Sequence, residues 1–168
     1  KSIGHMYTIP KEDRSSGIME TVLYQLSEMV AVRLRVLSLA ARSLYAHVRT
    51  VDKEYFGKGL RLGTAVQDGR DIFLRARQLL AQAGVGRGLV PISVGITAAD
   101  LSDEVLQPSL FPRDRKVAQL GHVIDTINYK YGQYTIGRVT PMGARRVIRD
   151  SVGFGRMKEF KVSPSYRG

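Results

Sequence analysis

The order of two hydrophobic periodicities constrains the fold of this chain more than any other feature. Alternating apolar residues predict strands, and apolar residues at helical spacing predict helices. Strands are expected over residues 1–9, 42–51, 60–66 and 90–97, and helices over residues 16–37 and 68–83. This order of strand, helix, strand, strand, helix, strand predicts an α+β fold. We expect a four-stranded antiparallel sheet with both helices on one face, as in ferredoxin-like arrangements.

The alternation also predicts which side chains face the two helices. The inward set is Leu44, Ala46, Val48, Leu60, Leu62, Thr64, Val66, Val90, Ile92, Val94 and Ile96. The outward set is Ser43, Tyr45, His47, Arg49, Pro91, Ser93, Gly95 and Thr97. Outward residues are small, polar or basic, so one sheet face is expected to stay uncovered and to meet a large polar partner.

Capping residues mark the expected helix ends. Ser15 or Ser16 is the expected N-cap of the first helix, and Asp68 with Asp71 is expected to cap the second. Gly84 is expected to end the second helix.

The pattern weakens beyond residue 101, and this division predicts two parts: a domain over residues 1–101 and a basic tail over residues 102–168. A short helix is expected over residues 114–131. Its apolar side would contain Val117, Leu120, Ile124 and Ile127.

Charge is concentrated in the second part of the chain. Residues 1–105 hold 14 basic and 11 acidic residues, whereas residues 106–168 hold 12 basic and 4 acidic residues, within a total of +11. Such a tail favours a polyanionic partner, most often nucleic acid, over an anionic membrane surface or a role in solubility alone. The absence of cysteine excludes disulfides and a thiol nucleophile. No apolar run is long enough to span a membrane, and no signal peptide is apparent. A cytoplasmic protein is therefore expected.

Residues Gln107-Pro108-Ser109-Leu110-Phe111 form the most informative short motif. Glutamine followed three residues later by Leu-Phe is the pattern with which bacterial proteins bind the sliding clamp. In such a peptide the Leu110–Phe111 pair would fill an apolar pocket while the Gln107 amide binds at its polar rim.

Catalytic and metal-binding chemistry finds little support in the sequence. His5, His47 and His122 lie far apart without metal-ligand spacing. Asp103-Glu104 has no partner carboxylate, and the glycines of 84–88 follow a helix instead of opening one. Tyr45 is a lone aromatic on the uncovered face, which is a weak signal for base stacking. We therefore expect no catalytic residue, metal site or cofactor in this chain.

Three features in the right order resemble the little-finger domain of Y-family translesion DNA polymerases, in the branch that includes bacterial polymerase IV. They are Lys1-Ser2-Ile3-Gly4 opening a strand, the order of helices and strands to about residue 101, and the tail. In the tail, the clamp-type peptide is followed by a helix that ends at Tyr131-Gly132. Because the chain begins with Lys1, we also expect it to be a fragment of a longer protein.

The resemblance implies that this chain grips primer–template duplex through phosphates while a separate palm domain, with its Mg²⁺, performs nucleotidyl transfer. Positions carried over by the resemblance are Lys1, Ser2, Gly4, His5, Gly57, Lys58 and Gly59. The chemistry of the predicted strands, apart from the resemblance, indicates Arg49 and Arg61 as further phosphate ligands and Ser93 as a ligand through its amide. One departure is that the strand around Pro91 and Gly95 lacks the arginine that family members often carry.

A second hypothesis is a stand-alone basic module of ferredoxin-like fold that binds RNA or DNA, in which Gln107–Phe111 is accidental. Under the first hypothesis duplex DNA and the bacterial sliding clamp are the partners, whereas a preference for single-stranded RNA would favour the second.

Overall fold

The computed structural model describes residues 1–86, 88–103, 112–132, 136 and 148. The elements in chain order are β1 (Ser2–Thr8), η1 (Lys11–Asp13), α1 (Ile18–Val36), β2 (Ala40–Thr50), β3 (Tyr55–Val66), α2 (Gly69–Gln82), β4 (Pro91–Ser102) and α3 (Pro112–Tyr131). The predicted order of strands and helices is confirmed, and so is the α+β class.

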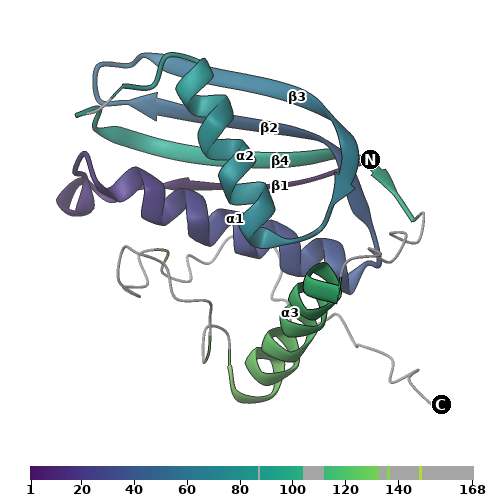
Figure 1. Ribbon diagram of the computed structural model, residues 1–168. Coiled ribbons are helices and arrows are strands. Elements are labelled where there is room, and N and C mark those ends of the chain that lie inside the picture. The colour runs from purple at the N-terminus through teal and green to yellow at the C-terminus, as the bar shows by residue number, and fades with distance from the viewer. Residues whose placement is uncertain (87, 104–111, 133–135, 137–147, 149–168) are drawn as a thin grey trace.

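The four strands form one antiparallel sheet in the order β1-β4-β2-β3. Two parallel strands, β1 and β2, are joined by α1 with β4 between them, and β3 and β4 are joined by α2 with β2 between them. This is the split βαβ connection of ferredoxin-like arrangements. Helices α1 and α2 cover the same face of the sheet (Figure 1), which leaves the other face open.

The core lies between the sheet and these two helices. Its largest fully buried side chains come from α1, α2, β2, β4 and the segment after β1; they are Ile9, Leu23, Leu26, Leu34, Leu44, Ile72, Leu79, Leu80 and Ile96. Each such side chain stabilises the fold by roughly 1.5–3 kcal/mol relative to an exposed position. Burial of the helix-covered face therefore stabilises the sheet, and the residues of the open face are not needed for the packing of this core.

The helix ends agree with the sequence in two cases and differ in one. The Asp68 side chain accepts hydrogen bonds from the backbone of Arg70 and Asp71, as an N-cap does. Gly84 has a φ of 95°, which favours glycine, and follows Ala83, the C-cap of α2. The N-cap of α1 is Gly17, without a side-chain cap, so the predicted cap at Ser15 or Ser16 is wrong. The chain passes through a turn at Ser15–Gly17 first.

Leu60, Thr64 and Ile92 of the predicted inward set are exposed or only half-buried, and Pro91 of the predicted outward set is buried. Irregularities of register lie beside Thr64, Ile92 and Pro91. Leu60 pairs with Leu44 but is 52% exposed, since β3 is an edge strand, and Thr64 is exposed beside a register shift near Ala41. A second shift, between Arg49 and Thr50, leaves Ile92 as an extra residue of β4. Consequently Pro91 is buried and Ile92 is only half-buried, the reverse of the prediction.

Helix α3 is attached to the C-terminal part of α1. The Arg35 guanidinium donates to both carboxylate oxygens of Asp125, at 2.5 and 2.8 Å, and also to the Gln67 carbonyl. The helix ends before Gly132, which has a φ of 109°. Downstream, Ile148 is buried against the core, and its amide donates to the Gln25 side chain at 2.9 Å. Two parts of the predicted tail therefore contact the domain.

Candidate nucleic-acid interface

The strand register sorts the open face into four cross-strand rows. Side chains of residues that face each other across antiparallel strands point to the same side of a sheet. The rows that point away from the helices are Ser2–Ala99–Ser43–Arg61, Gly4–Thr97–Tyr45–Gly59, Met6–Gly95–His47–Gly57 and Thr8–Ser93–Arg49–Tyr55. The intervening rows contain core residues such as Ala46, Val48, Val94 and Ile96. The open face is thus built from all four strands.

Seven of the predicted DNA-binding residues lie together on this open face, namely Ser2, Gly4, Arg49, Gly57, Gly59, Arg61 and Ser93. His5 and Lys58 do not. His5 pairs with Ile96 and Lys58 pairs with Ala46, so both side chains point to the helix side. The prediction grouped residues that are consecutive in sequence, and a strand cannot turn consecutive side chains to one face. Lys1 precedes β1 and is exposed.

Three aromatic rings form the middle of the open face. The His47 ring lies 5.6 Å from the Tyr55 ring at an interplanar angle of 22°, and 5.8 Å from the Tyr45 ring at 34°. The hydroxyls of Tyr45 and Tyr55 are hydrogen-bonded at 2.9 Å. We call Tyr45, His47 and Tyr55 the aromatic platform. Tyr45, a lone aromatic in the sequence, therefore has two ring neighbours in the structure.

Glycines on the adjacent strands make room for these rings. A Cβ at Gly95 would lie 2.6 Å from Nε2 of His47 and would overlap Cε1 of the same ring. A Cβ at Gly57 would overlap the Tyr45 hydroxyl, and one at Gly59 would lie 3.3 Å from the Tyr45 ring. The space that a side chain would occupy at Gly57 and Gly59 is thus filled by Tyr45.

Burial and hydrogen bonding shift the titration of the platform. Partial burial lowers the pKa of His47 below its usual value of 6.5, so the imidazole is neutral at pH 7. The hydrogen bond between the Tyr55 and Tyr45 hydroxyls, with smaller contributions from burial and the Tyr45 charge, raises the pKa of Tyr55 to about 12. On the helix side, burial and then the nearby Arg33 charge lower the pKa of His5. The His47 and Tyr55 rings are therefore uncharged around neutral pH.

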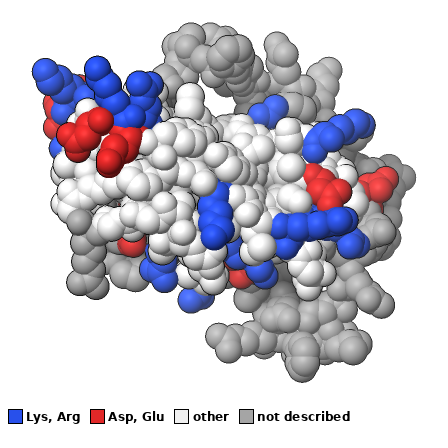
Figure 2. All heavy atoms as spheres, turned by 90° about the horizontal axis from the view of Figure 1, so that it is seen from above, with Lys and Arg blue, Asp and Glu red and all other residues white. Residues whose placement is uncertain are grey.

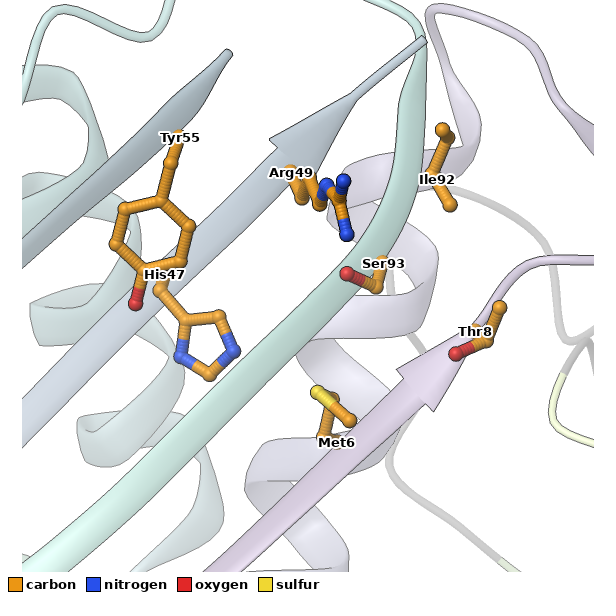
Figure 3. Close-up of a pocket in the computed structure, with 7 residues that line it drawn as sticks. All are labelled: Met6, Thr8, His47, Arg49, Tyr55, Ile92 and Ser93. Carbon is orange, nitrogen blue, oxygen red and sulfur yellow. The ribbon is translucent and has the colours of Figure 1, made fainter. Parts of the chain in front are cut away.

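A hollow of about 560 Å³ lies at the edge of the platform. Its lining residues come from β1, β2, β3 and β4 and are Met6, Thr8, His47, Arg49, Tyr55, Ile92 and Ser93. Figure 3 shows the Tyr55 and His47 rings side by side, with Arg49 and Ser93 next to them and Met6 and Thr8 on the neighbouring strand. One cation, the aliphatic hydroxyls of Thr8 and Ser93, and two ring systems thus line one space.

Positive charge on the open face is sparser than the sequence led us to expect. Within the four strands, which are fully described, the outward rows include two arginines, Arg49 and Arg61. Arg61 lies 3.5 Å from the Asp100 carboxylate, in an exposed ion pair that contributes little stability. Figure 2, a view from above relative to Figure 1, shows most Lys and Arg toward the two ends of this side of the molecule, beside Asp and Glu, with mostly uncharged atoms between them.

The clamp-type residues Gln107, Leu110 and Phe111 lie outside the described residues. Among the residues that are described, no group of three or more His, Asp or Glu side chains could hold a metal ion. In the same part of the chain, no helix is long and apolar enough to span a membrane.

Sequence reasoning missed Met6, Thr8 and Tyr55 as members of the site. The predicted strand over residues 60–66 began too late to include Tyr55, which is the first residue of β3. The tight hairpin between β2 and β3 could have identified Tyr55 as a member of the site. A turn in which Lys53 adopts a φ of 64° places Tyr55 opposite Arg49 and next to His47.

Comparison with known proteins identifies the family. The model of the impB/mucB/samB family C-terminal domain matches residues 1–110, which is more than half of the chain. The chain belongs to this family. Its members form the C-terminal, little-finger part of Y-family DNA polymerases, so the resemblance that the sequence indicated is confirmed.

Relatives of the chain are named DNA polymerase IV. One from Moorella thermoacetica is 30% identical over 149 residues, which is 88% of this chain and 37% of that protein. DNA polymerase IV 1 from Halalkalibacterium halodurans is 29% identical, over 82% of this chain and 34% of the relative. DNA polymerase IV 2 from Bacillus subtilis is 26% identical, over 86% and 36%. The chain thus spans about a third of the length of these relatives.

Two solved structures are also similar to the chain. An insertion ternary complex of Dbh DNA polymerase is 13% identical, covers 58% of this chain and 28% of that one, and gives a TM-score of 0.47. A complex of the beta-clamp processivity factor with the little finger domain of PolIV is 15% identical, covers 59% and 87%, and gives a TM-score of 0.45.

The fit between glycine and ring is testable at Gly95. In Gly95→Ala the new methyl group would overlap His47, and we expect the free energy of unfolding to fall by about 1–3 kcal/mol, as for other overpacked sites. Gly63→Ala on β3 is the matched control, because no atom lies within 4 Å of its Cβ position. Urea unfolding followed by circular dichroism measures both. Equal stability of Gly95→Ala and wild type would contradict the described packing.

Proposed function

We propose that this chain is the DNA-gripping and clamp-tethering part of a Y-family DNA polymerase of the polymerase IV type, acting on primer–template duplex in DNA repair in the cytoplasm. Family membership supports a role as one part of a polymerase. In this proposal the catalytic carboxylates and their Mg²⁺ belong to the rest of the parent protein, since the relatives are about three times as long as the aligned chain.

The observation that carries the duplex part of the proposal is the open face. It is a broad sheet surface from four strands with Arg49, Arg61, Ser2 and Ser93 on its outward rows. Arginine and serine side chains bind phosphates without reading sequence, as a polymerase that must move along DNA requires. With few cations on this face, the sheet alone would hold duplex weakly. The tail, with 12 basic and 4 acidic residues over 106–168, adds attraction.

The clamp part of the proposal rests on Gln107-Pro108-Ser109-Leu110-Phe111 and on its place in the chain. The motif lies between β4, which ends at Ser102, and α3, which begins at Pro112. A weak grip on duplex and a weak clamp peptide in one chain raise the effective concentration of each partner at the other site. Such a polymerase would reach a stalled primer and still dissociate from it.

The duplex proposal is tested by removing one charge from each face. Arg49→Ala should weaken binding to a primer–template duplex and should reduce the slope of log K against log salt by about 0.9, the value for one phosphate contact. Arg70→Ala removes the same charge from the exposed start of α2, on the helix side, and should leave the slope unchanged. Fluorescence anisotropy over a salt series measures both. An equal response of the two variants would contradict the proposal.

The clamp proposal is tested by surface plasmon resonance on an immobilised bacterial sliding clamp. The double variant Leu110→Ala, Phe111→Ala should lose binding by a factor of at least ten, because the pair supplies the apolar anchor. Its duplex affinity and its thermal unfolding midpoint should match wild type. Val123→Ala on α3, an exposed apolar residue outside the motif, is the control and should retain clamp binding. Retained binding in the double variant would refute the assignment of the motif.

A further inference from the structure

The aromatic platform has a chemistry that phosphate binding does not use. Phosphate ligands are cations, hydroxyls and amides, whereas Tyr45, His47 and Tyr55 present flat ring systems. The glycines opposite Tyr45 and His47 allow these rings to lie across neighbouring strands. We propose that the platform is a stacking site for an unpaired base of a DNA strand. This inference rests on the proposed function, in which the open face meets DNA.

Exposure separates this role from structural packing alone. Cross-strand aromatic pairs stabilise a sheet, and the contacts of His47 with Tyr45 and Tyr55 do so here. Packing does not require the rings to face solvent, yet Tyr55 is 59% exposed and neighbouring Met6 is 63% exposed. These two side chains line the same hollow. An exposed apolar surface of this kind is typical of a binding site.

The His47 and Tyr55 rings are neutral, and this favours a base over a phosphate as the stacked group. Burial lowers the pKa of His47, and the Tyr45 hydroxyl raises that of Tyr55, so neither ring is charged at pH 7. Every nucleobase has a π face, and stacking on an aromatic side chain is tolerant of sequence. Arg49 lines the same hollow and would bind the phosphate attached to the stacked nucleotide (Figure 3).

An unpaired base fits the platform and a paired one does not. Inside a duplex the ring faces of the bases are stacked on each other, and only base edges, sugars and phosphates reach a protein surface. An unpaired template base offers its ring face. We therefore expect the open face to hold duplex through Arg49 and Arg61 and to add affinity wherever a base beside it is unstacked.

The test compares two single strands that carry the same phosphates. A fluorescein-labelled oligo-dT and an oligomer of equal length made of abasic nucleotides are bound to the full chain at one fixed salt concentration. Wild type should bind oligo-dT more tightly than the abasic strand. Tyr55→Leu, which keeps apolar bulk without a ring, should weaken binding to oligo-dT roughly tenfold and leave the abasic strand unaffected.

Two further variants complete the experiment. Tyr55→Phe retains the ring and should bind oligo-dT as wild type does. Tyr129→Leu removes an exposed tyrosine from α3, 70% exposed, and should also bind as wild type. If Tyr55→Leu weakens both strands equally, or neither, or if Tyr55→Phe loses as much as Tyr55→Leu, the stacking site is refuted. Thermal unfolding of each variant confirms that it is folded.

Duplex binding distinguishes this failure from failure of the proposed function. If wild type binds duplex with the Arg49-dependent salt slope but shows no preference for oligo-dT over the abasic strand, the stacking inference falls and the duplex grip stands. If wild type binds neither duplex nor oligo-dT, both proposals are refuted.

Discussion

The antiparallel pairing of β4 with β1 and β2 is the constraint on which the rest of the structure depends. It fixes a register in which Ile96 faces Ala46 and Val94 faces Val48 on the helix side. Because side chains alternate along a strand, the same register sets Gly95 beside His47 and Ser93 beside Arg49 on the open side. The buried core therefore determines the composition of the exposed face. A slip of the strand register by one residue would turn the core residues to the open face and the open-face residues to the core.

On the open face, large aromatic rings pack against glycines of the neighbouring strands. His47 lies over Gly95, and Tyr45 lies against Gly57 and Gly59, so the rings occupy positions that a Cβ would fill. Glycine weakens a strand interior, by roughly 0.5–1 kcal/mol relative to alanine. The loss at these positions is offset by ring contacts and by the hydrogen bond between Tyr45 and Tyr55. The result is an uncharged centre on the open face of a chain with a net charge of +11.

The fold was largely predictable from the sequence, because the periods of two and of 3.6 residues are strong in residues 1–101. The positions of single side chains were less so. Ile92 and Pro91 exchanged sides at a bulge, which depends on pairing between strands that are about 40 residues apart in the chain. His5 and Lys58 were assigned to the interface by their place in a motif, and alternation puts both on the helix side. Tyr55 became visible only with the hairpin register. Local patterns carry secondary structure, whereas the composition of a face depends on long-range register.

The duplex proposal requires DNA to contact the open face and not the helices. A titration of the ¹⁵N-labelled chain with a short primer–template duplex, followed by amide chemical shifts, tests this directly. Perturbed amides should lie on the sheet around Thr8, Arg49, Tyr55 and Ser93, while those along α1 and α2 should stay unchanged. Perturbations concentrated on α1 and α2, with the sheet amides unmoved, would contradict it.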